Sequence, residues 1–474
     1  MGKVEKLVTL INTDFYDPNS SRELLLDHSV YKNVLYSQKK DAINKACKAI
    51  SEKSLYSAAL QDGQRFFHVA FSDYDTFKRS EKNNLVYRIE QDNDNYYIST
   101  GLYCGVINFG DNRPKIEIQT GYSDRFFKRI LNYCCGIYAD TFSSETSTES
   151  ESIYSLLVQY LLLASLRKVA GQTIPRKYVY LTNRDYSING NVDINAYINH
   201  DLLSYDKKIT YNYPAHLEIQ AIIDVLHSAI KCCRIKNSMN ELPQIVGFKN
   251  HLCELYSGKK PSKRVIKTIQ NDKCLSNSLY SGFKRPLEYA RILLEANDVN
   301  SGGEHSTAGV SGFLVDASFL WEMYLYNLMT LNLENWEIDA QRQISFYDAT
   351  FYPKNNYPDF VLTNKITGEI FVLDAKFKRM QFDGKDVDND DLRQLHAYAY
   401  YFQLTAGDKF KGAGLIYPTK NPQPDGIKTD DHIFGITSAK QRFGVFSVKD
   451  PDQNETIVDN ERMFIFALKK FLND

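Results

Sequence analysis

The sequence lacks the short motifs that define the common nucleotide-binding and hydrolytic sites. It has no G-x-x-x-x-G-K-[ST] loop, because Ser257-Gly-Lys-Lys lacks both the upstream glycine and the hydroxyl residue. It has no H-E-x-x-H and no G-x-S-x-G. These absences exclude a recognisable phosphate-cradling loop and argue against zinc peptidases and serine hydrolases. No zinc finger, helix-turn-helix or other specific DNA-reading motif stands out.

The eight cysteines are also unsuited to a structural zinc site. Two adjacent pairs occur, at Cys134-Cys135 and Cys232-Cys233, but no C-x₂-C pair is present. Adjacent cysteines are poorly placed to chelate one tetrahedral zinc together. A reduced protein with buried thiols is therefore expected.

Signals for membrane insertion or secretion are missing. No apolar segment follows the opening Met1-Gly-Lys-Val-Glu-Lys, so no signal peptide is indicated. The most apolar run, from Leu156 to Leu166, is interrupted by Gln159 and is too short to span a bilayer. These features predict a cytoplasmic protein without membrane contact.

The chain has almost no net charge, which limits how it can bind nucleic acid. Its formal net charge is −1, whereas free-standing nucleic-acid binders are usually basic. DNA contact therefore needs a local basic patch or a partner. One basic run contains Lys259, Lys260, Lys263, Arg264 and Lys267. This run is equally compatible with phosphate contact and with an ordinary solvated loop.

Length and patterning predict a mixed α/β protein of three parts. The chain has 474 residues, of which 43% are hydrophobic, enough for two or three domains with real cores. Short alternating runs predict a mostly β N-terminal module over residues 1–142, with strands near 66–71, 96–100, 105–109 and 115–119 and a helix at 126–138. Residues 143–305 are expected to form an α-helical connector, with helices at 152–169, 214–234 and 284–297 and a hinge at 297–312. Residues 306–474 are expected to form an α/β domain with strands at 413–418 and 445–448 and a final helix at 460–472.

The most informative feature is a predicted β-hairpin. It joins Tyr357-Pro-Asp-Phe-Val-Leu to Phe371-Val-Leu-Asp-Ala-Lys-Phe, and so brings together Asp359, Asp374 and Lys376. The second strand is apolar on both faces, as in a buried central strand. A buried carboxylate and ammonium are costly unless they pair or bind a ligand, and the second carboxylate exceeds what one lysine can neutralise.

A divalent cation would balance the surplus negative charge. Carboxylates, carbonyls and waters are the hard oxygen ligands that Mg²⁺ prefers, and Mn²⁺ can substitute for it. Such an ion polarises a phosphate and acidifies a bound water, while Lys376 would orient the nucleophile and offset developing charge. The pattern therefore favours phosphodiester hydrolysis. The alternative is a surface hairpin with an ordinary Asp–Lys ion pair.

Two flanking helices carry further candidate residues. Glu322 lies among apolar residues in Ser318-Phe-Leu-Trp-Glu-Met-Tyr-Leu, so its side chain is expected to point inward. In the segment after the hairpin, Gln394 and Tyr398 share one helix face at i, i+4. Leu392, Leu395, Ala399 and Phe402 are expected to form the apolar face of the same helix.

Pro358-Asp359 followed by Asp374-Ala-Lys376 resembles the PD-(D/E)XK nuclease signature. The resemblance implies that residues 306–474 form a nuclease domain in which Asp359, Asp374 and Glu322 bind the metal. It also implies that Gln394, in the Q-x-x-x-Y helix, borders the active site, and that Glu322 completes the metal or water shell.

Longer segments resemble McrC, of the LlaJI-type branch. They are Lys115-Ile-Glu-Ile-Gln-Thr-Gly-Tyr-Ser-Asp, Ile174-Pro-Arg-Lys-Tyr-Val-Tyr and Asn189-Gly-Asn-Val-Asp-Ile. Asn191 stands where McrC-like sequences usually have an arginine. The resemblance implies a restriction endonuclease subunit for anti-phage defence that cleaves double-stranded DNA, often modified DNA. It further implies an McrB-like AAA+ GTPase partner bound through the N-terminal part, GTP used only by that partner, and pairing of nuclease domains for double-strand cleavage.

Two other functions remain open at the level of sequence. One alternative is a non-cleaving regulator that stimulates a partner NTPase. The other is a stand-alone nuclease for repair or RNA processing. The intact set of Asp359, Asp374 and Lys376 argues against the regulator. The large portion outside the nuclease domain argues for a partnered machine.

Overall fold

The computed structural model describes residues 6–11, 23–26, 65–68, 87–92, 95–108, 115–134, 153–204, 206–233, 243–300, 311–347, 355–378, 387–420, 428–430, 441–452 and 455–473. The chain divides into two units. One unit combines Met1–Asp140 with His305–Asp474, and the other is Thr141–Glu304.

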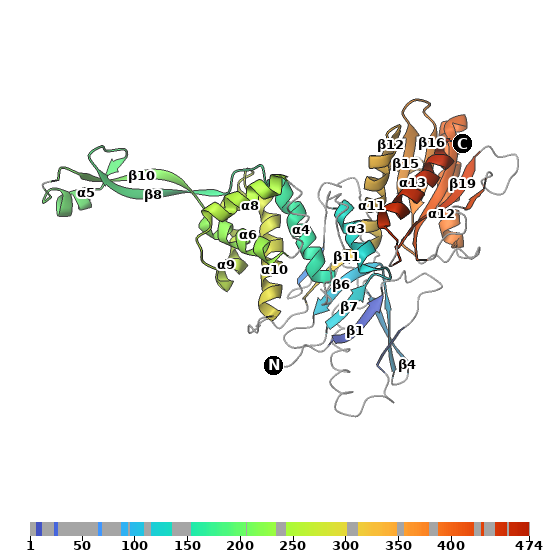
Figure 1. Ribbon diagram of the computed structural model, residues 1–474, viewed down its shortest axis with the longest axis horizontal. Coiled ribbons are helices and arrows are strands. Elements are labelled where there is room, and N and C mark those ends of the chain that lie inside the picture. Colours follow the sequence, from blue (N-terminus) through green and yellow to red (C-terminus); the bar gives the residue numbers. More distant parts are fainter. Residues whose placement is uncertain are drawn as a thin grey trace. The chain divides into compact units, whose positions relative to one another are not determined.

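Within the described residues of the C-terminal segment, a mixed six-stranded sheet forms the centre (Figure 1). In spatial order its strands are β12 (Trp336–Ala340), β15 (Phe360–Asn364), β16 (Ile370–Ala375), β17 (Phe410–Thr419), β19 (Arg442–Lys449) and β18 (Lys428–Asp430). Strands β12, β15 and β16 pair antiparallel, whereas β16, β17 and β19 run parallel. The helix between β16 and β17, α12 (Asn389–Ala406), supplies the crossover that a parallel pair requires.

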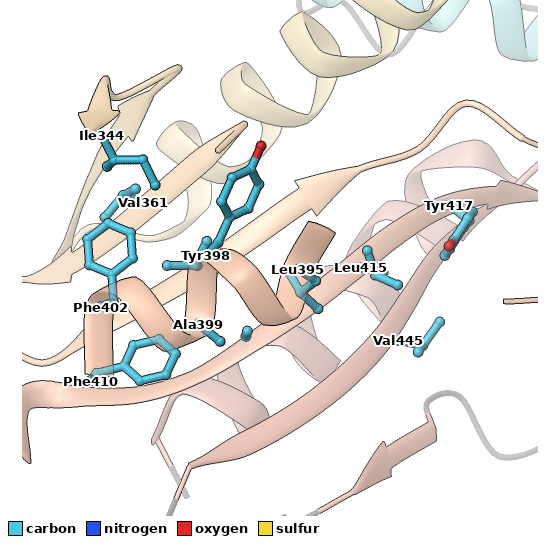
Figure 2. Packing of buried hydrophobic residues seen from close by; sticks show 12 residues of the cluster. Ile344, Val361, Leu395, Tyr398, Ala399, Phe402, Phe410, Leu415, Tyr417 and Val445 are labelled. Carbon is cyan, nitrogen blue, oxygen red and sulfur yellow. The ribbon is translucent and has the colours of Figure 1, made fainter. Parts of the chain in front are cut away.

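Helix α12 covers one face of this sheet. Figure 2 shows Leu395 and Phe402 of the helix packed with Val361 of β15 and Leu415 of β17. Leu395 and Phe402 are buried, and burial of one such side chain contributes about 1.5–3 kcal/mol. The apolar face predicted for this helix is confirmed, with Leu392 only partly buried at its edge.

Helix α13 (Ile457–Asn473) packs on β19 and places an aromatic side chain over the sheet. The Phe471 ring lies 5.3 Å from that of Phe371 on β16 and 5.1 Å from that of Phe446 on β19. The neighbours Val372 and Val445 belong to the core on the α12 side. Because side chains alternate along a strand, β16 and β19 are covered on both faces, as the apolar sequence of β16 predicts.

Strands from both ends of the sequence share a second sheet. Its order is β1 (Lys6–Ile11), β7 (Lys115–Gln119), β6 (Tyr103–Asn108), β11 (Ser311–Asp316) and β3 (Arg65–His68). A three-stranded sheet contains β2 (Glu23–Leu26), β5 (Asn95–Thr100) and β4 (Tyr87–Asp92). Strand β11 leads directly into α11 (Ala317–Asn332), so the second sheet is joined to the C-terminal segment.

Helix α3 (Asp124–Cys134) also connects the N-terminal segment to the C-terminal one. It packs against α11, where the Phe126 ring lies 6.1 Å from Trp321 and the Cys134 thiol donates a hydrogen bond to the Leu320 carbonyl. Just before α3, the Tyr122 hydroxyl donates to the Pro418 carbonyl, near the end of β17, at 3.1 Å. Part of the N-terminal segment therefore packs beside the strands of the six-stranded sheet.

The unit Thr141–Glu304 combines a helical bundle with a long hairpin. Among the described residues, the bundle contains helices α4 (Ile153–Val169), α6 (Gln220–Cys232), α8 (Pro243–Leu255), α9 (Lys263–Thr268) and α10 (Lys284–Asn300). Helix α10 packs against both α4 and α6. Leu162, Leu226 and Leu293, one from each of these helices, are buried.

The hairpin, residues 176–218, is called the arm below. Strands β8 (Arg176–Asp185) and β10 (Ile209–Glu218) pair along ten residues, and β9 (Asn191–Val192) adds to β10. Figure 1 shows the arm extending away from the helices of its own unit and ending in α5 (Ile194–Ala196) and the π-helix η2 (Tyr197–Asp201). A two-stranded ribbon has little core of its own, and the arm exposes large apolar side chains, including Tyr186, Ile194, Ile198, Leu202 and Leu203.

Several sequence expectations are corrected by these elements. The helix expected at 214–234 begins at Gln220, because residues up to Glu218 pair with β8. The middle region is therefore not wholly helical. Much of the expected hinge at 297–312, and the end of the helix expected at 126–138, lie outside the described residues. The division into domains at 142 and 305 stays a prediction, as does a separate N-terminal module.

The described helices include none that is apolar over a length sufficient to cross a membrane. Among the cysteines, Cys104, Cys134 and Cys233 are buried, whereas Cys253 is exposed. Burial raises the pKa of the Cys233 thiol to about 12, so it stays protonated near neutral pH. The expectation of buried thiols therefore holds for some positions and not for Cys253.

Candidate active site

The predicted hairpin is present and carries the two aspartates at the same end. Asp359 directly precedes β15, and Asp374 is the fifth residue of β16; the two strands pair with Phe360 opposite Leu373. Asp359 is 8% exposed and Asp374 is 1% exposed. The connecting turn uses Gly368 at a φ of 70°, a left-handed conformation that glycine adopts without strain.

Lys376 follows β16 and faces Asp374. Its backbone N–H donates to the Ile416 carbonyl, which continues the pairing with β17. Its ammonium nitrogen lies 2.7 Å from Asp374 Oδ2 and donates to Gln394 Oε1 at 2.7 Å. The Gln394 amide in turn donates to the Tyr398 hydroxyl at 2.8 Å. The predicted shared face of Gln394 and Tyr398 is therefore confirmed, and it borders Lys376.

Glu322 reaches the site from α11. The helix is capped by Asp316, whose carboxylate accepts the backbone N–H groups of Ser318 and Phe319, an arrangement typical of helix N-termini. Glu322 is 2% exposed, which confirms the inward orientation expected from sequence. Of the five predicted site residues, Lys376 contacts Asp374 and Gln394 directly, and the charges of Glu322 and Asp374 act on the pKa of Asp359.

One residue of the site was not anticipated from the sequence. Gln341, just after β12, donates from its amide nitrogen to Asp359 Oδ1 at 2.8 Å and to Glu322 Oε2 at 3.1 Å. The second oxygen of Asp359 accepts the backbone N–H of Ala375 at 2.8 Å. Gln341 is therefore the bridge between the glutamate of α11 and the aspartate of the hairpin.

A second cluster beside Lys376 was also missed. Asp391, 4% exposed, lies 3.7 Å from the Lys376 ammonium and 3.2 Å from that of Lys378. Its other oxygen accepts the Tyr417 hydroxyl at 3.1 Å. Lys378 follows Lys376 at the strand period, which is the only sequence signal that points to this cluster.

Negative charge exceeds positive charge around the hairpin. Burial, together with the carboxylates of Glu322 and Asp374, raises the pKa of Asp359 well above its ordinary value. Burial alone would lower the pKa of Lys376, but Asp374, Asp359 and Asp391 outweigh it and raise this pKa above its ordinary value. Lys376 therefore stays charged, while the carboxylates lack enough cations.

The donor set suits a divalent cation. Asp374 Oδ2 is buried, and despite the nearby ammonium it accepts no well-aligned hydrogen bond from the described residues. Within the same residues, no group of three or more His, Cys, Asp or Glu side chains can hold a metal ion as arranged. Mg²⁺ needs only one or two protein carboxylates because it keeps several waters. In charge and donor type, Asp359, Asp374 and Glu322 fit that ion.

The structure thus places buried carboxylates and a lysine at one end of an inner hairpin of a mixed sheet, with donor types that suit a metal ion. Residues 98–418 match the family described as McrBC 5-methylcytosine restriction system component, which covers most of the chain. The chain belongs to this family.

Two solved structures resemble the chain. One is a half-complex from a tetradecameric assembly of Thermococcus gammatolerans McrB AAA+ hexamers with bound McrC, at 14% identity and a TM-score of 0.49, covering 98% of this chain and 99% of that one. The other is the Thermococcus gammatolerans McrBC complex, at 13% identity and a TM-score of 0.31, covering 69% of this chain and 88% of that one. No curated protein matches the chain.

Proposed function

We propose that the protein is the Mg²⁺-dependent DNA endonuclease subunit of an McrBC-type restriction complex, with a PD-(D/E)XK nuclease core around the six-stranded sheet. One observation carries the proposal. Asp359 and Glu322 accept hydrogen bonds from one amide, and Asp374 pairs with Lys376, at the end of a buried hairpin in a chain that belongs to a restriction-system family.

The roles of the residues follow from their contacts. Asp359, Asp374 and Glu322 would hold the metal ion. When bound, Mg²⁺ supplies polarisation of the phosphate and a more acidic water. Lys376 remains protonated, since its pKa is raised. It therefore orients the attacking water and offsets the charge that develops on the phosphate, and it does not act as a base.

Two residues of α12 hold the lysine in place. Gln394 accepts from the Lys376 ammonium and is itself held by Tyr398. An ammonium on a flexible side chain is most effective when its position is set before the reaction. We assign Gln394 this supporting role.

A partner is also part of the proposal. The chain has no phosphate-binding loop of its own, and family membership supports work with an McrB-like AAA+ GTPase. Residues 1–142 remain the contact region expected from sequence. The arm is an additional candidate, because Leu203 at its far end is 76% exposed and other large apolar residues surround the same end. Exposed apolar groups that gather in this way are typical of protein contact surfaces.

The test is cleavage of long methylated and unmethylated DNA with Mg²⁺, with and without the AAA+ partner and GTP. Asp374→Ala should lower cleavage by about 100-fold or more, since loss of metal binding forfeits several kcal/mol of transition-state stabilisation. Stimulation of the partner's GTP hydrolysis should persist. The matched control is Asp390→Ala, which removes an exposed carboxylate paired with Arg393 on α12 and should cleave normally.

Each outcome selects one function. Cleavage only with partner and GTP, lost in Asp374→Ala, supports the proposal. Partner-free cleavage indicates a stand-alone nuclease. Faster GTP hydrolysis without any cleavage indicates a non-cleaving regulator, and full cleavage by Asp374→Ala refutes the site assignment.

A further inference from the structure

Gln341 has a backbone conformation that is unusual for its residue type. Its φ is 53°, and the only other non-glycine residue with positive φ among the described residues is Lys207, in the arm, at 59°. Left-handed backbone at a non-glycine residue costs about 1 kcal/mol or more. Such strain persists only where surrounding contacts fix it.

The hydrogen bonds that Gln341 donates go to Asp359 and Glu322. Its backbone N–H donates to the Asp359 carbonyl at 3.0 Å. Its side-chain nitrogen donates to Asp359 Oδ1 at 2.8 Å and to Glu322 Oε2 at 3.1 Å. The left-handed turn after β12 therefore lets one residue hold both the backbone and the side chain of Asp359, and a second carboxylate from α11.

The chemistry of the amide is as informative as its position. A primary amide has two N–H donors on one nitrogen, so it can serve two carboxylates at once. It adds no positive charge, unlike lysine or arginine. The negative charge that attracts a divalent cation is therefore preserved, while the two like-charged groups are kept from turning away from each other.

We infer that Gln341 is a positioning residue that pre-arranges Glu322 and Asp359 for a divalent cation, an inference that rests on the proposed function. Hydrogen bonds to ligating carboxylates commonly orient them, and their removal typically weakens metal binding 10–100-fold. Because Gln341 acts on the ligands, its effect should be visible in metal affinity without DNA or partner.

The experiment measures Mn²⁺ binding to the full chain by electron paramagnetic resonance of the free ion. Gln341→Met keeps the length of the side chain without the donors and should bind Mn²⁺ about 10-fold more weakly. Gln341→Gly should lose affinity similarly, yet its free energy of unfolding should not fall, because glycine relieves the left-handed strain. A merely structural residue would lose stability and affinity together.

Two further variants, Gln341→Asn and Lys207→Gly, test the same inference. Gln341→Asn tolerates left-handed backbone and keeps a shorter amide, so it should bind Mn²⁺ more tightly than Gln341→Gly. Lys207→Gly relieves the same kind of strain in the arm and should bind Mn²⁺ like the wild type. An Asn variant no better than the Gly variant would overturn the inference.

The parallel variant Asp374→Ala separates this inference from the proposed function. If Asp374→Ala binds Mn²⁺ like the wild type, or the wild type binds none, the assignment of these carboxylates as metal ligands is wrong. If Asp374→Ala loses binding while the Met and Gly variants of Gln341 keep wild-type affinity, the site stands and only the positioning role fails.

Discussion

Replacing Arg129 with methionine removes the cation from a buried ion pair that joins α3 to α13. The guanidinium donates two hydrogen bonds to Glu461, from Nε to Oε1 at 2.8 Å and from Nη2 to Oε2 at 2.7 Å. Their side chains are 7% and 5% exposed. The Tyr324 hydroxyl, on α11, donates to the same Oε1 at 2.9 Å. Three helices therefore meet at one carboxylate.

The expected loss of stability follows from this burial. Burial alone would lower the pKa of Arg129, but the hydrogen bonds and charge of Glu461 outweigh it and raise the pKa above its ordinary value, so the Arg129 guanidinium stays charged. Removing one member of a buried pair leaves the other charge uncompensated and costs about 3–5 kcal/mol. Replacing both Arg129 and Glu461 by methionine should cost much less, since an apolar pair leaves no charge in the core.

The assay is urea unfolding followed by tryptophan emission. The chain has two tryptophans, Trp321 and Trp336, and both lie in the unit that contains Arg129. The matched control is Arg462→Met, which removes an exposed arginine paired with Asp459 on α13 and should cost no more than about 0.5 kcal/mol. A loss below about 1 kcal/mol for Arg129→Met, or a double variant less stable than this single one, would refute the reasoning.

Four further substitutions test the site and the arm. Gln394→Ala should lower cleavage about 10-fold, because the Lys376 ammonium loses a charge-assisted hydrogen bond. Tyr398→Phe removes only the hydroxyl that accepts a hydrogen bond from the Gln394 amide, so it should lower cleavage less than Gln394→Ala does. A cleavage assay in which Tyr398→Phe has the larger effect would contradict the assignment. Gly190→Ala should distort the arm, since its Cβ would lie 2.3 Å from the Asn212 carbonyl oxygen; limited proteolysis should show faster cutting there with unchanged tryptophan emission. Leu203→Ser should weaken partner GTPase stimulation while leaving the melting temperature unchanged, and full stimulation would exclude this part of the arm as a contact.

The hairpin and its neighbours could be predicted because their signals are local. Strand β16 is apolar on both faces, which only a central strand tolerates, and it lies between β15 and β17. The residues of helix α12 follow the 3.6-residue helical period. This period places its apolar residues on the face that packs on the sheet, and it places Gln394 beside Tyr398. Asp359 and Asp374 converge because the strands that carry them are paired.

Gln341 could not be predicted, since its role depends on contacts between distant residues. Its bonds to Glu322 and Asp359 span 19 and 18 positions. They require the register of β12 against β15, with Ala340 opposite Phe360. They also require a left-handed turn at a residue that rarely adopts one. No short-range pattern encodes either condition.

The arm was missed for a different reason. Its second strand contains Pro214, Ala215 and Leu217 and runs almost directly into α6, so the apolar residues of strand and helix form one continuous pattern. A short apolar run does not distinguish strand from helix by itself. Pairing with β8 decides the outcome, and that pairing is visible only in the folded chain.

The surroundings of α11 show that the site depends on residues far from the hairpin. Nearly every side chain of this helix from Ala317 to Met329 is buried, so its sequence has no polar face to indicate which side meets the active site. The direction of Glu322 is instead set by what packs around it. Trp321 and Tyr324 contact Phe126 of α3, and Tyr324 also binds Glu461 of α13. The segment before residue 143 therefore contributes to the geometry of the candidate site, although every proposed metal ligand lies after residue 315.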